Sequence, residues 1–392
     1  MLNFKVIGAG AAGNKAAIEL INQGFNRCDI TFVNSTAKDM PESEEFDDCN
    51  KIIFGKNTLG GCGKERTIGK KLFLQDLKTN NVNLDSIADP DTNAVIIVSS
   101  TEGGSGSAVT PILAKYFKEV VGVPVILCLF FGFNSDVRGM QNSIEICQEL
   151  SEDYGVIAIS NSKFISGDDF NYTRAESQAN KLFAQFVRIL SGEDIKSGSQ
   201  NIDDTDLLKI VTTPGYINIG KVALDKIKNV TQFNNAVSSA LDDSCLIDIS
   251  TKGVKRLGLI FDIGDSHYDA MDFSAGTLIE RFGVPYEKFM HIQNTISSDT
   301  LTWIATGMKL PIDEIKEIFE GYIEQSNSVN KNKDSFFDEI STLQGNEEDG
   351  AFNMLNNKTA PTKNKEDFFS DFGMGEKVTK KSSATKSAKS EY

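Results

Sequence analysis

Residues 99–108 have the sequence Ser-Ser-Thr-Glu-Gly-Gly-Ser-Gly-Ser-Ala and lie between two patterned segments. The apolar, β-branched run 94–98 before them is typical of a buried strand, and the apolar residues of 109–121 recur at helical spacing. Glycines let backbone N–H groups converge on an anion, and the N-terminus of the following helix adds partial positive charge. The pattern predicts phosphate binding rather than an ordinary turn, through Gly103, Gly104, Ser105, Gly106 and Ser107.

A second glycine-rich loop lies near the N-terminus. Strand-like residues 4–7 lead into Gly8-Ala9-Gly10-Ala11-Ala12-Gly13-Asn14, and a helix is predicted from about residue 15 to 22. This is the G-x-G-x-x-G pattern that opens nucleotide-binding α/β domains. A dinucleotide enzyme would also carry Asp or Glu at the end of its second strand, whereas strand 29–33 ends in Asn34-Ser35-Thr36. The missing acid makes a nicotinamide or flavin oxidoreductase the weaker alternative.

A third glycine-rich loop, Leu59-Gly60-Gly61-Cys62-Gly63-Lys64, follows a short predicted strand at 51–54. Three such loops, each after a strand, are explained most economically if they converge at one edge of a parallel sheet around a polyphosphate. A Walker A loop is excluded, because no Gly-Lys pair in the chain is followed by Ser or Thr.

Composition limits the class of protein. A hydrophobic fraction of 40% over 392 residues indicates two packed domains, or one large α/β unit with an appendage. The net charge of -15 argues against a body that binds nucleic acid unaided. Six cysteines without a C-x-x-C pair, and only two histidines, support neither a disulfide framework nor a zinc site. No apolar run approaches about 20 residues and no signal-peptide pattern is present, so we expect a cytoplasmic protein without membrane contact.

Strands alternate with helices through residue 160, which predicts an α/β fold with a doubly wound parallel sheet. Further strands are predicted at 123–131 and 155–160, and a long amphipathic helix at 172–190. The second half of the chain is predicted to hold strands at 216–220, 245–250, 256–262 and 286–292, and helices at 221–229, 275–282 and 311–322, the last extending as far as 328.

Two motifs, placed on either side of the long helix, resemble the tubulin and bacterial FtsZ superfamily of filament-forming GTPases. Residues 102–108 are similar to its signature loop G-G-G-T-G-T/S-G, with substitutions at Glu102, Ser105 and Ala108. The segment 201–206, Asn-Ile-Asp-Asp-Thr-Asp, resembles its synergy-loop pattern N-x-D-x-x-D. The resemblance covers about residues 1–310 and implies GTP or GDP with Mg²⁺ as cofactors, and no metal site made of protein ligands.

The resemblance also implies a division of the chain. The expected parts are a GTP-binding domain at 1–171, a central helix with its connecting loop at 172–200, a smaller α/β activation domain at 201–310, a C-terminal helix at 311–330 and a flexible tail at 331–392.

Site residues are implied position by position. Those matching the nucleotide loops are Gly8, Gly10, Ala11, Ala12, Gly13, Asn14, Asn34, Thr36, Gly60, Gly61 and Gly63, besides the signature-loop residues named above. Asn134 and Arg138 lie in the loop near the ribose, where the family pattern E-G-x-x-R has Glu at the position of Asn134. Asn161 and Asn180 match positions that bind the guanine edge.

Catalysis is expected to fall to carboxylates. The resemblance implies that Asp203 and Asp206, with Asn201, act on GTP held by the next subunit, so that the site is complete only in a head-to-tail filament. The alternative from the local sequence is that these acids cap the helix that follows. His267 and His291 are interpreted as ordinary packed or surface residues.

The tail and the altered signature loop favour one branch, the plasmid and phage partition tubulins (TubZ). Residues 366–372 form an acidic-aromatic segment that could fold on a partner, and the end is rich in lysine, at Lys377, Lys380, Lys381, Lys386 and Lys389. The resemblance implies that this tail engages a DNA-bound adaptor of TubR type, and DNA only indirectly. A merely solubilising tail, and an FtsZ-like role in cell division or in positioning phage DNA, are the alternatives.

Overall fold

The computed structural model describes residues 1–56, 61–133, 136–150, 153–165, 171–248, 252–264, 271–295, 299–329 and 363–374. Among the predicted site residues, Gly60 and Asn134 lie outside these ranges, as do His267 and the five lysines of the tail end.

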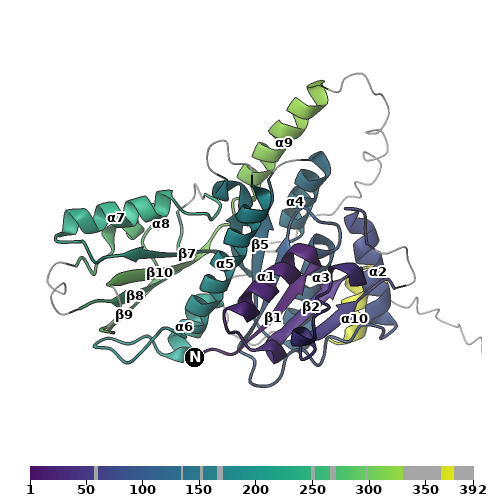
Figure 1. Ribbon diagram of the computed structural model, residues 1–392, viewed down its shortest axis with the longest axis horizontal. Coiled ribbons are helices and arrows are strands. Elements are labelled where there is room, and N and C mark those ends of the chain that lie inside the picture. Colours follow the sequence, from purple (N-terminus) through teal and green to yellow (C-terminus); the bar gives the residue numbers. More distant parts are fainter. Residues whose placement is uncertain are drawn as a thin grey trace, which may run out of the picture.

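One ten-stranded sheet runs through the molecule (Figure 1) in the order β3-β2-β1-β4-β5-β6-β7-β10-β8-β9. The strands are β1 (Phe4–Ala9), β2 (Ile30–Asn34), β3 (Asn50–Ile53), β4 (Ala94–Ser100), β5 (Val125–Phe131), β6 (Gly155–Ser160), β7 (Gly215–Ala223), β8 (Arg256–Asp262), β9 (Glu287–Gln293) and β10 (Thr300–Met308). All neighbours from β3 to β7 pair in parallel, whereas β10 is antiparallel to both β7 and β8.

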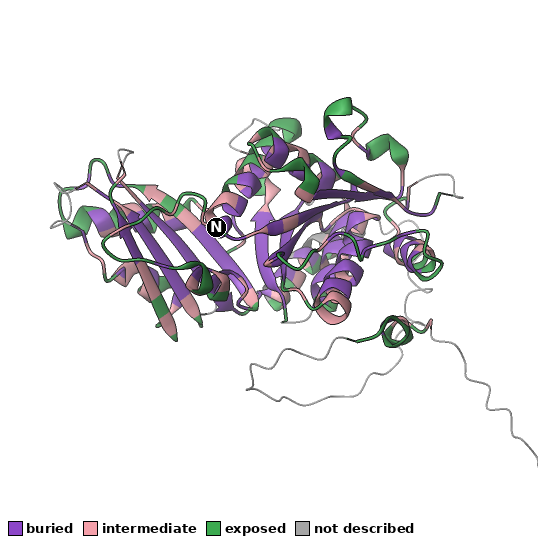
Figure 2. Cartoon of the chain, turned by 90° about the horizontal axis from the view of Figure 1, so that it is seen from below, coloured by how far each residue is buried: buried purple, intermediate pink, exposed green. Residues whose placement is uncertain are grey.

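The helices cover this sheet and connect its strands. They are α1 (Gly10–Asn22), α2 (Arg66–Lys78), α3 (Gly106–Tyr116), α4 (Val137–Glu149), α5 (Tyr172–Ser191), α6 (Asp204–Val211), α7 (Val230–Asp242), α8 (Gly276–Phe282), α9 (Ile312–Val329) and α10 (Lys365–Asp371). Strands β4 and β5 are buried along almost their whole length, and Figure 2 shows that most of the sheet is coloured as buried. Burial on both faces explains their nearly continuous apolar sequences and confirms the predicted α/β fold.

The long helix predicted at 172–190 is confirmed as α5. It packs against α1, and its predicted apolar face is buried at Phe183, Phe186, Val187 and Leu190, whereas Leu182 is partly buried. Beyond α5 the sheet continues without a break, because β7 joins β6. That junction is short, with only Gly155 and Val156 of β6 paired to β7.

Three predictions for the second half are wrong. Segment 245–250 is not a strand in its described part, where only Leu246 forms an isolated bridge, to Ile159. No helix forms at 221–229, because β7 extends to Ala223 and α7 begins at Val230. Leu224 and Ile227 are buried from a turn, so their helix-like spacing reflects packing.

The third error is the omission of β10, a central strand of this half. Its sequence contains Thr and Gly among apolar residues and gives no clean period-2 signal. Trp303 on β10 lies over Gly220 of β7, where an added Cβ would be 2.0 Å from the indole ring. A glycine in an adjacent strand thus makes room for the single tryptophan of the chain.

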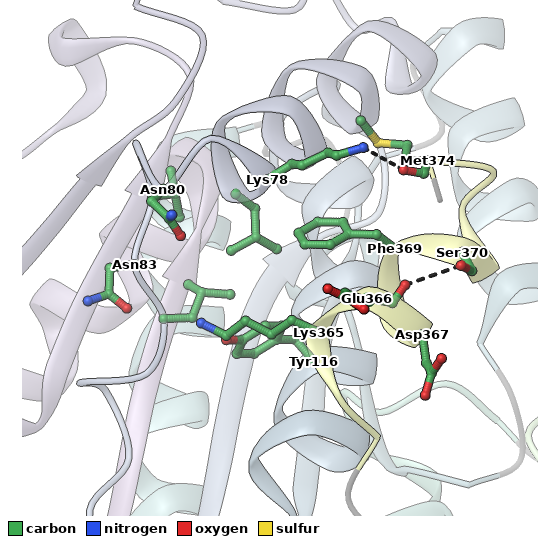
Figure 3. A pocket seen from close by; sticks show the side chains of 13 residues that line it. Lys78, Asn80, Asn83, Tyr116, Lys365, Glu366, Asp367, Phe369, Ser370 and Met374 are labelled. Carbon is green, nitrogen blue, oxygen red and sulfur yellow. Dashed lines mark hydrogen bonds between the residues drawn. The ribbon is translucent and has the colours of Figure 1, made fainter. Parts of the chain in front are cut away.

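Residues 363–374 belong to the predicted flexible tail but fold against the body of the protein as α10. Phe368 is fully buried, and its ring meets that of Tyr116 edge-on, with centroids 5.3 Å apart. Figure 3 shows Phe369 extending from α10 into the pocket that separates it from α2. The acidic-aromatic segment therefore has a docking surface on its own chain.

Charged groups fix the position of α10 at several points. Lys365 Nζ lies 2.6 Å from Asp85 Oδ2, and Lys115 Nζ lies 2.8 Å from Asp371 Oδ2. Lys78 Nζ donates to the carbonyl oxygen of Met374 at 2.6 Å. Hydrogen bonds from Lys115 and Lys363 hold the pKa of Asp371 below its ordinary value. The docked orientation is thus selected by complementary charges around a buried aromatic ring.

Replacing Phe368 with Ala is expected to release α10. Truncating a buried Phe costs about 3–5 kcal/mol, whereas each exposed ion pair contributes about 0–1 kcal/mol and a helix of seven residues is marginal by itself. Amide hydrogen exchange over 368–374 should rise to the rate of an unstructured peptide. Glu366→Ala, at an exposed position of the same helix, is the control and should keep the protection. Retained protection in Phe368→Ala would contradict the docking.

Candidate functional site

A cavity of about 310 Å³ opens at the carboxyl ends of β1, β2 and β4. This is the edge at which α/β sheets bind ligands. The residues that line it are Ala9, Gly10, Ala11, Ala12, Asn34, Thr36, Asp39, Gly61, Cys62, Gly63, Lys64, Ser100, Gly103, Gly104, Ser105 and Gly106. The three glycine loops predicted to converge do so in this cavity.

Two helix N-termini meet at this cavity. α1 begins at Gly10 and α3 at Gly106, and neither has a side-chain cap. The first N–H groups of both helices have no partner within their helix, and both carry partial positive charge. Gly10 has a φ of +74°, and a Cβ there would be 2.8 Å from the backbone nitrogen of Gly106. The close approach concentrates donors in the manner of a phosphate site.

Side-chain contacts link several of the loops around this cavity. The hydroxyls of Ser35 and Ser105 are 2.6 Å apart, which links the loop after β2 to the loop after β4. Lys64 lines the cavity and pairs with Asp136 at 2.6 Å. Asp39 also lines it and accepts a hydrogen bond from Asn34 Nδ2 at 3.4 Å. The cavity thus holds a cation, a carboxylate and hydroxyls beside its backbone donors.

Four of the predicted contact residues stand behind the cavity wall and do not line it. A Cβ on Gly8 would be 2.7 Å from Gly13 O, so each glycine permits the approach of the other's backbone. Asn14 is buried and donates from Nδ2 to the carbonyl oxygen of Asp39 at 3.2 Å. Ser107 donates to the carbonyl oxygen of Gly103. These residues shape the loops that form the cavity.

A smaller cavity of about 100 Å³ adjoins the first, since Ala12 and Ser100 line both. Its other residues are Lys15, Glu102, Phe130, Gly132, Phe133, Asn161, Glu176 and Asn180. The two asparagines predicted to bind a base therefore face one cavity, beside aromatic side chains. Phe133 is held by Tyr172 of α5, with ring centroids 4.5 Å apart.

Arg138 lines neither cavity. Its guanidinium pairs with Glu65 at 2.7 Å and lies 3.9 Å from Glu145. In this structure the arginine joins α4 to Glu65, the residue before α2. Asn134 is the other residue predicted near a ribose, and it lies outside the described ranges.

Arg66, the first residue of α2, was not predicted as important and is 1% exposed. It donates to Glu145 at 2.9 Å, to Glu149 at 2.7 Å and to the carbonyl oxygen of Ser107 at 3.1 Å. This guanidinium connects α2, α3 and α4 directly behind the phosphate-type loops. A lone Arg after Gly-Lys-Glu gives no sequence signal for such a role.

Replacing Arg66 with Ala is expected to lower the free energy of unfolding by about 2 kcal/mol. Breaking a fully buried ion pair costs about 3–5 kcal/mol. The expected loss is smaller here because the side chains of Glu145 and Glu149 are 43% and 32% exposed, so water solvates both carboxylates once the arginine is removed. Chemical denaturation measures the difference. Lys70→Ala, which removes the more exposed partner of Glu149, should cost less than about 1 kcal/mol and is the matched control. Equal losses for both variants would contradict the assigned role.

The predicted catalytic acids lie at the opposite edge of the sheet. Asp203 is the N-cap of α6, and its side chain accepts from Asp206 N at 2.8 Å. Asp204 pairs with the amino group of Met1 at 2.8 Å, which places α6 beside the start of β1 (Figure 1). Asn201 and Asp203 are exposed and Asp206 is partly so. The capping alternative is thus observed for Asp203.

His291 supports this acidic loop. It is 1% exposed, and its Nδ1 accepts from Ile202 N at 3.2 Å. The opposite nitrogen, Nε2, lies 3.0 Å from Gln293 Oε1, which also accepts from Lys196 N at 2.7 Å. His291 is therefore the packed residue that the sequence suggested, and it holds the backbone between Asn201 and Asp203.

Residues 3–167 match the model described as Tubulin/FtsZ family, GTPase domain. The chain carries a Tubulin/FtsZ-family GTPase domain. That match includes the loops of both cavities and ends before α5 and α6.

Relatives of the tubulin/FtsZ domain extend the comparison. The cell division protein FtsZ of Mycoplasmopsis pulmonis is 27% identical over 221 residues, which are 55% of this chain and 50% of that protein. The chain thus spans about half the length of this curated relative.

Two solved structures share the fold. CetZ2 of Haloferax volcanii, in a GTPγS-bound protofilament, is 17% identical with a TM-score of 0.67, over 83% of this chain and 100% of that one. TubZ of Bacillus thuringiensis serovar israelensis, in a GTPγS-form protofilament, is 15% identical with a TM-score of 0.66, over 85% and 95%. At this level of identity the likeness establishes the fold, including the half beyond the matched domain.

Within the part of the chain that the structure describes, no helix combines the length and the apolar character that a membrane span requires. No cluster of three or more His, Cys, Asp or Glu side chains in the same ranges could hold a metal ion.

Proposed function

We propose that the protein is a GTPase that polymerises head to tail, with hydrolysis completed between two subunits. The observation that supports this proposal is that the cavity and the acidic loop lie at opposite ends of the strands of one sheet. The cavity lies at the end of β1, and the acidic loop lies beside its start. β1 has six residues, which span about 20 Å at a rise of ~3.3 Å per residue.

The first cavity fits the phosphates of a nucleotide. Backbone N–H groups at the start of α1 and α3, the hydroxyl of Ser105 and the ammonium of Lys64 supply donors and positive charge. The second cavity, with Asn161 and Asn180, fits a base, since an amide side chain both donates and accepts hydrogen bonds. Mg²⁺ bound with a nucleotide takes most of its ligands from phosphate and water and neutralises phosphate charge. Asp39 is the carboxylate on the cavity wall that would help to hold it.

The acids cannot reach this cavity within one subunit. Asp203 and Asp206 are available at the surface, so a second copy stacked on the cavity brings them to a bound phosphate. A carboxylate there can orient a water molecule for attack, which is the protein's main task in phosphoryl transfer besides charge neutralisation. Because the two contact surfaces differ, the association is heterologous, and in this proposal the rotation between successive subunits does not close a ring. An open filament is the expected product.

The test follows light scattering and phosphate release with GTP, GDP, ATP or NADH in Mg²⁺ buffer over a range of protein concentrations. Scattering and turnover that appear only with GTP, above a critical concentration, support the proposal. Turnover per subunit that is independent of concentration would contradict completion in trans. A response to NADH alone would contradict the nucleotide class.

We further propose that the filament segregates plasmid or phage DNA through an adaptor. Support comes from the tail, whose five terminal lysines give a basic end to an acidic protein. Retention of a TubR-type adaptor by the full-length chain, and its loss when the five lysines are changed to Gln, is the expected result. An FtsZ-like filament with another duty is the alternative, and it predicts no adaptor binding.

A further inference from the structure

The two adjoining cavities limit where the sugar of a bound nucleotide must lie. If phosphates occupy the first cavity and the base faces Asn161 and Asn180 in the second, the ribose lies between them. Ala12 and Ser100 line both cavities and mark this junction. Recognition of a ribose diol in proteins is commonly performed by a carboxylate, which accepts hydrogen bonds from both hydroxyls.

Glu102 lines the second cavity, as Ala12 and Ser100 do, and provides a carboxylate there. A Cβ added to Gly132 would be 2.0 Å from Glu102 Oε2, so only glycine at position 132 leaves room for the side chain in this orientation. Gly139 also leaves space for Glu102, because a Cβ at position 139 would lie 3.2 Å from both Cβ and Cγ of Glu102. Two glycines from the next loop and helix thus accommodate this side chain.

The backbone of Glu102 is also held firmly. Its N–H donates to Ser100 Oγ at 3.2 Å, and its carbonyl oxygen accepts from Asn142 Nδ2 at 2.9 Å. Glu102 and Glu176 are the two carboxylates among the residues that line this cavity, and Glu176 pairs with Lys15 of α1 at 3.1 Å. Glu102 is the one that follows Ser100, a residue of both cavities, and its backbone and side chain are positioned by the contacts described above.

We propose that the carboxylate of Glu102 binds the ribose hydroxyls of the nucleotide. The inference rests on the proposed guanine nucleotide site and assigns it a specificity residue in the signature loop itself. Hydrogen bonds to a charged group contribute about 1.5–3 kcal/mol, so removing the diol or the carboxylate should weaken binding by about 10- to 100-fold.

The experiment measures the dissociation constants of GTP and 2′,3′-dideoxy-GTP for the full chain by calorimetry, at protein concentrations below assembly. The wild type should prefer GTP by about 10- to 100-fold. Glu102→Ala should lose this preference and bind both nucleotides with the weaker constant. Glu102→Gln, which has nearly the same shape, should retain part of it, and its thermal unfolding midpoint should match that of the wild type.

Glu176→Ala is the matched comparison, because it removes the other carboxylate of the same cavity. It should retain the preference for GTP over the dideoxy analogue. Loss of preference in Glu176→Ala, or its retention in Glu102→Ala, would overturn the assignment of Glu102. If the wild type bound neither nucleotide, the proposed function itself would fail, so the two failures are distinguishable.

Discussion

Replacing Asp206 with Ala is expected to lower GTP turnover at least about 100-fold while filaments still assemble and become more stable. In the proposed filament this side chain lies on the surface that a second subunit brings to the nucleotide, and its removal would leave the attacking water without the carboxylate that orients it. Binding of GTP should be unchanged, because the cavity lies at the far end of β1. Phosphate release and sedimentation, measured on the same sample, check the result.

Substitution of Asp206 tests the catalytic role more directly than substitution of Asp203, because Asp203 also has a structural role. The carboxylate of Asp203 caps α6, so its removal costs about 1 kcal/mol of helix stability besides any catalytic effect. Asp203→Asn keeps a capping side chain and removes the charge, which separates the two roles. A fall in turnover for Asp203→Asn with unchanged thermal stability would assign chemistry to Asp203 as well. Loss of turnover in Asp203→Ala alone would favour capping.

Mixing two variants tests whether the site is shared. Asn180→Ala should weaken nucleotide binding but keep the acids, whereas Asp206→Ala keeps the nucleotide cavity. In a mixed filament, an Asp206→Ala subunit holds GTP that an Asn180→Ala neighbour can attack through its intact acids. Recovered turnover in the mixture, absent from either variant alone, is the expected result. No recovery, with mixed filaments confirmed by labelling, would contradict a shared site.

The parts of the site that depend on local sequence were predictable. Gly10, Ser105 and Gly106 belong to strand–glycine–helix patterns, and such patterns converge at one sheet edge for topological reasons. Asn161 and Asn180 carry no local signal, and their placement followed only from the resemblance. The structure now brings both to one cavity.

The unpredicted parts depend on contacts between segments distant in sequence. Arg66 is important because three helices place acceptors around it. The position of Glu102 against Gly132 requires the loop after β4 to meet the loop after β5. The docking of α10 depends on the contact of Phe368 with Tyr116, which lies more than 250 residues earlier in the chain. Periodicity and motif spacing describe one segment at a time and cannot reveal such contacts.

Replacing Gly13 with Ala is expected to destabilise the GTPase domain by at least about 3 kcal/mol. Helix propensity alone predicts the opposite, since Ala is favoured over Gly by about 1 kcal/mol inside a helix such as α1. The added Cβ would, however, lie 2.2 Å from the carbonyl oxygen of Val98 in β4, an atom fixed by the sheet. Overpacking against flexible side chains costs about 1–3 kcal/mol, and here backbone must move instead.

Gly103→Ala is the matched control for this clash. Gly103 belongs to the phosphate-type loop, has no atom within 4 Å of an added Cβ and needs no left-handed backbone. It should unfold at the wild-type midpoint in chemical denaturation, whereas Gly13→Ala should unfold at much lower denaturant or not fold at all. Equal midpoints would mean that α1 can move away from β4. The third glycine of G-x-G-x-x-G acts here through helix–strand packing, which is why it is required although it does not line the cavity.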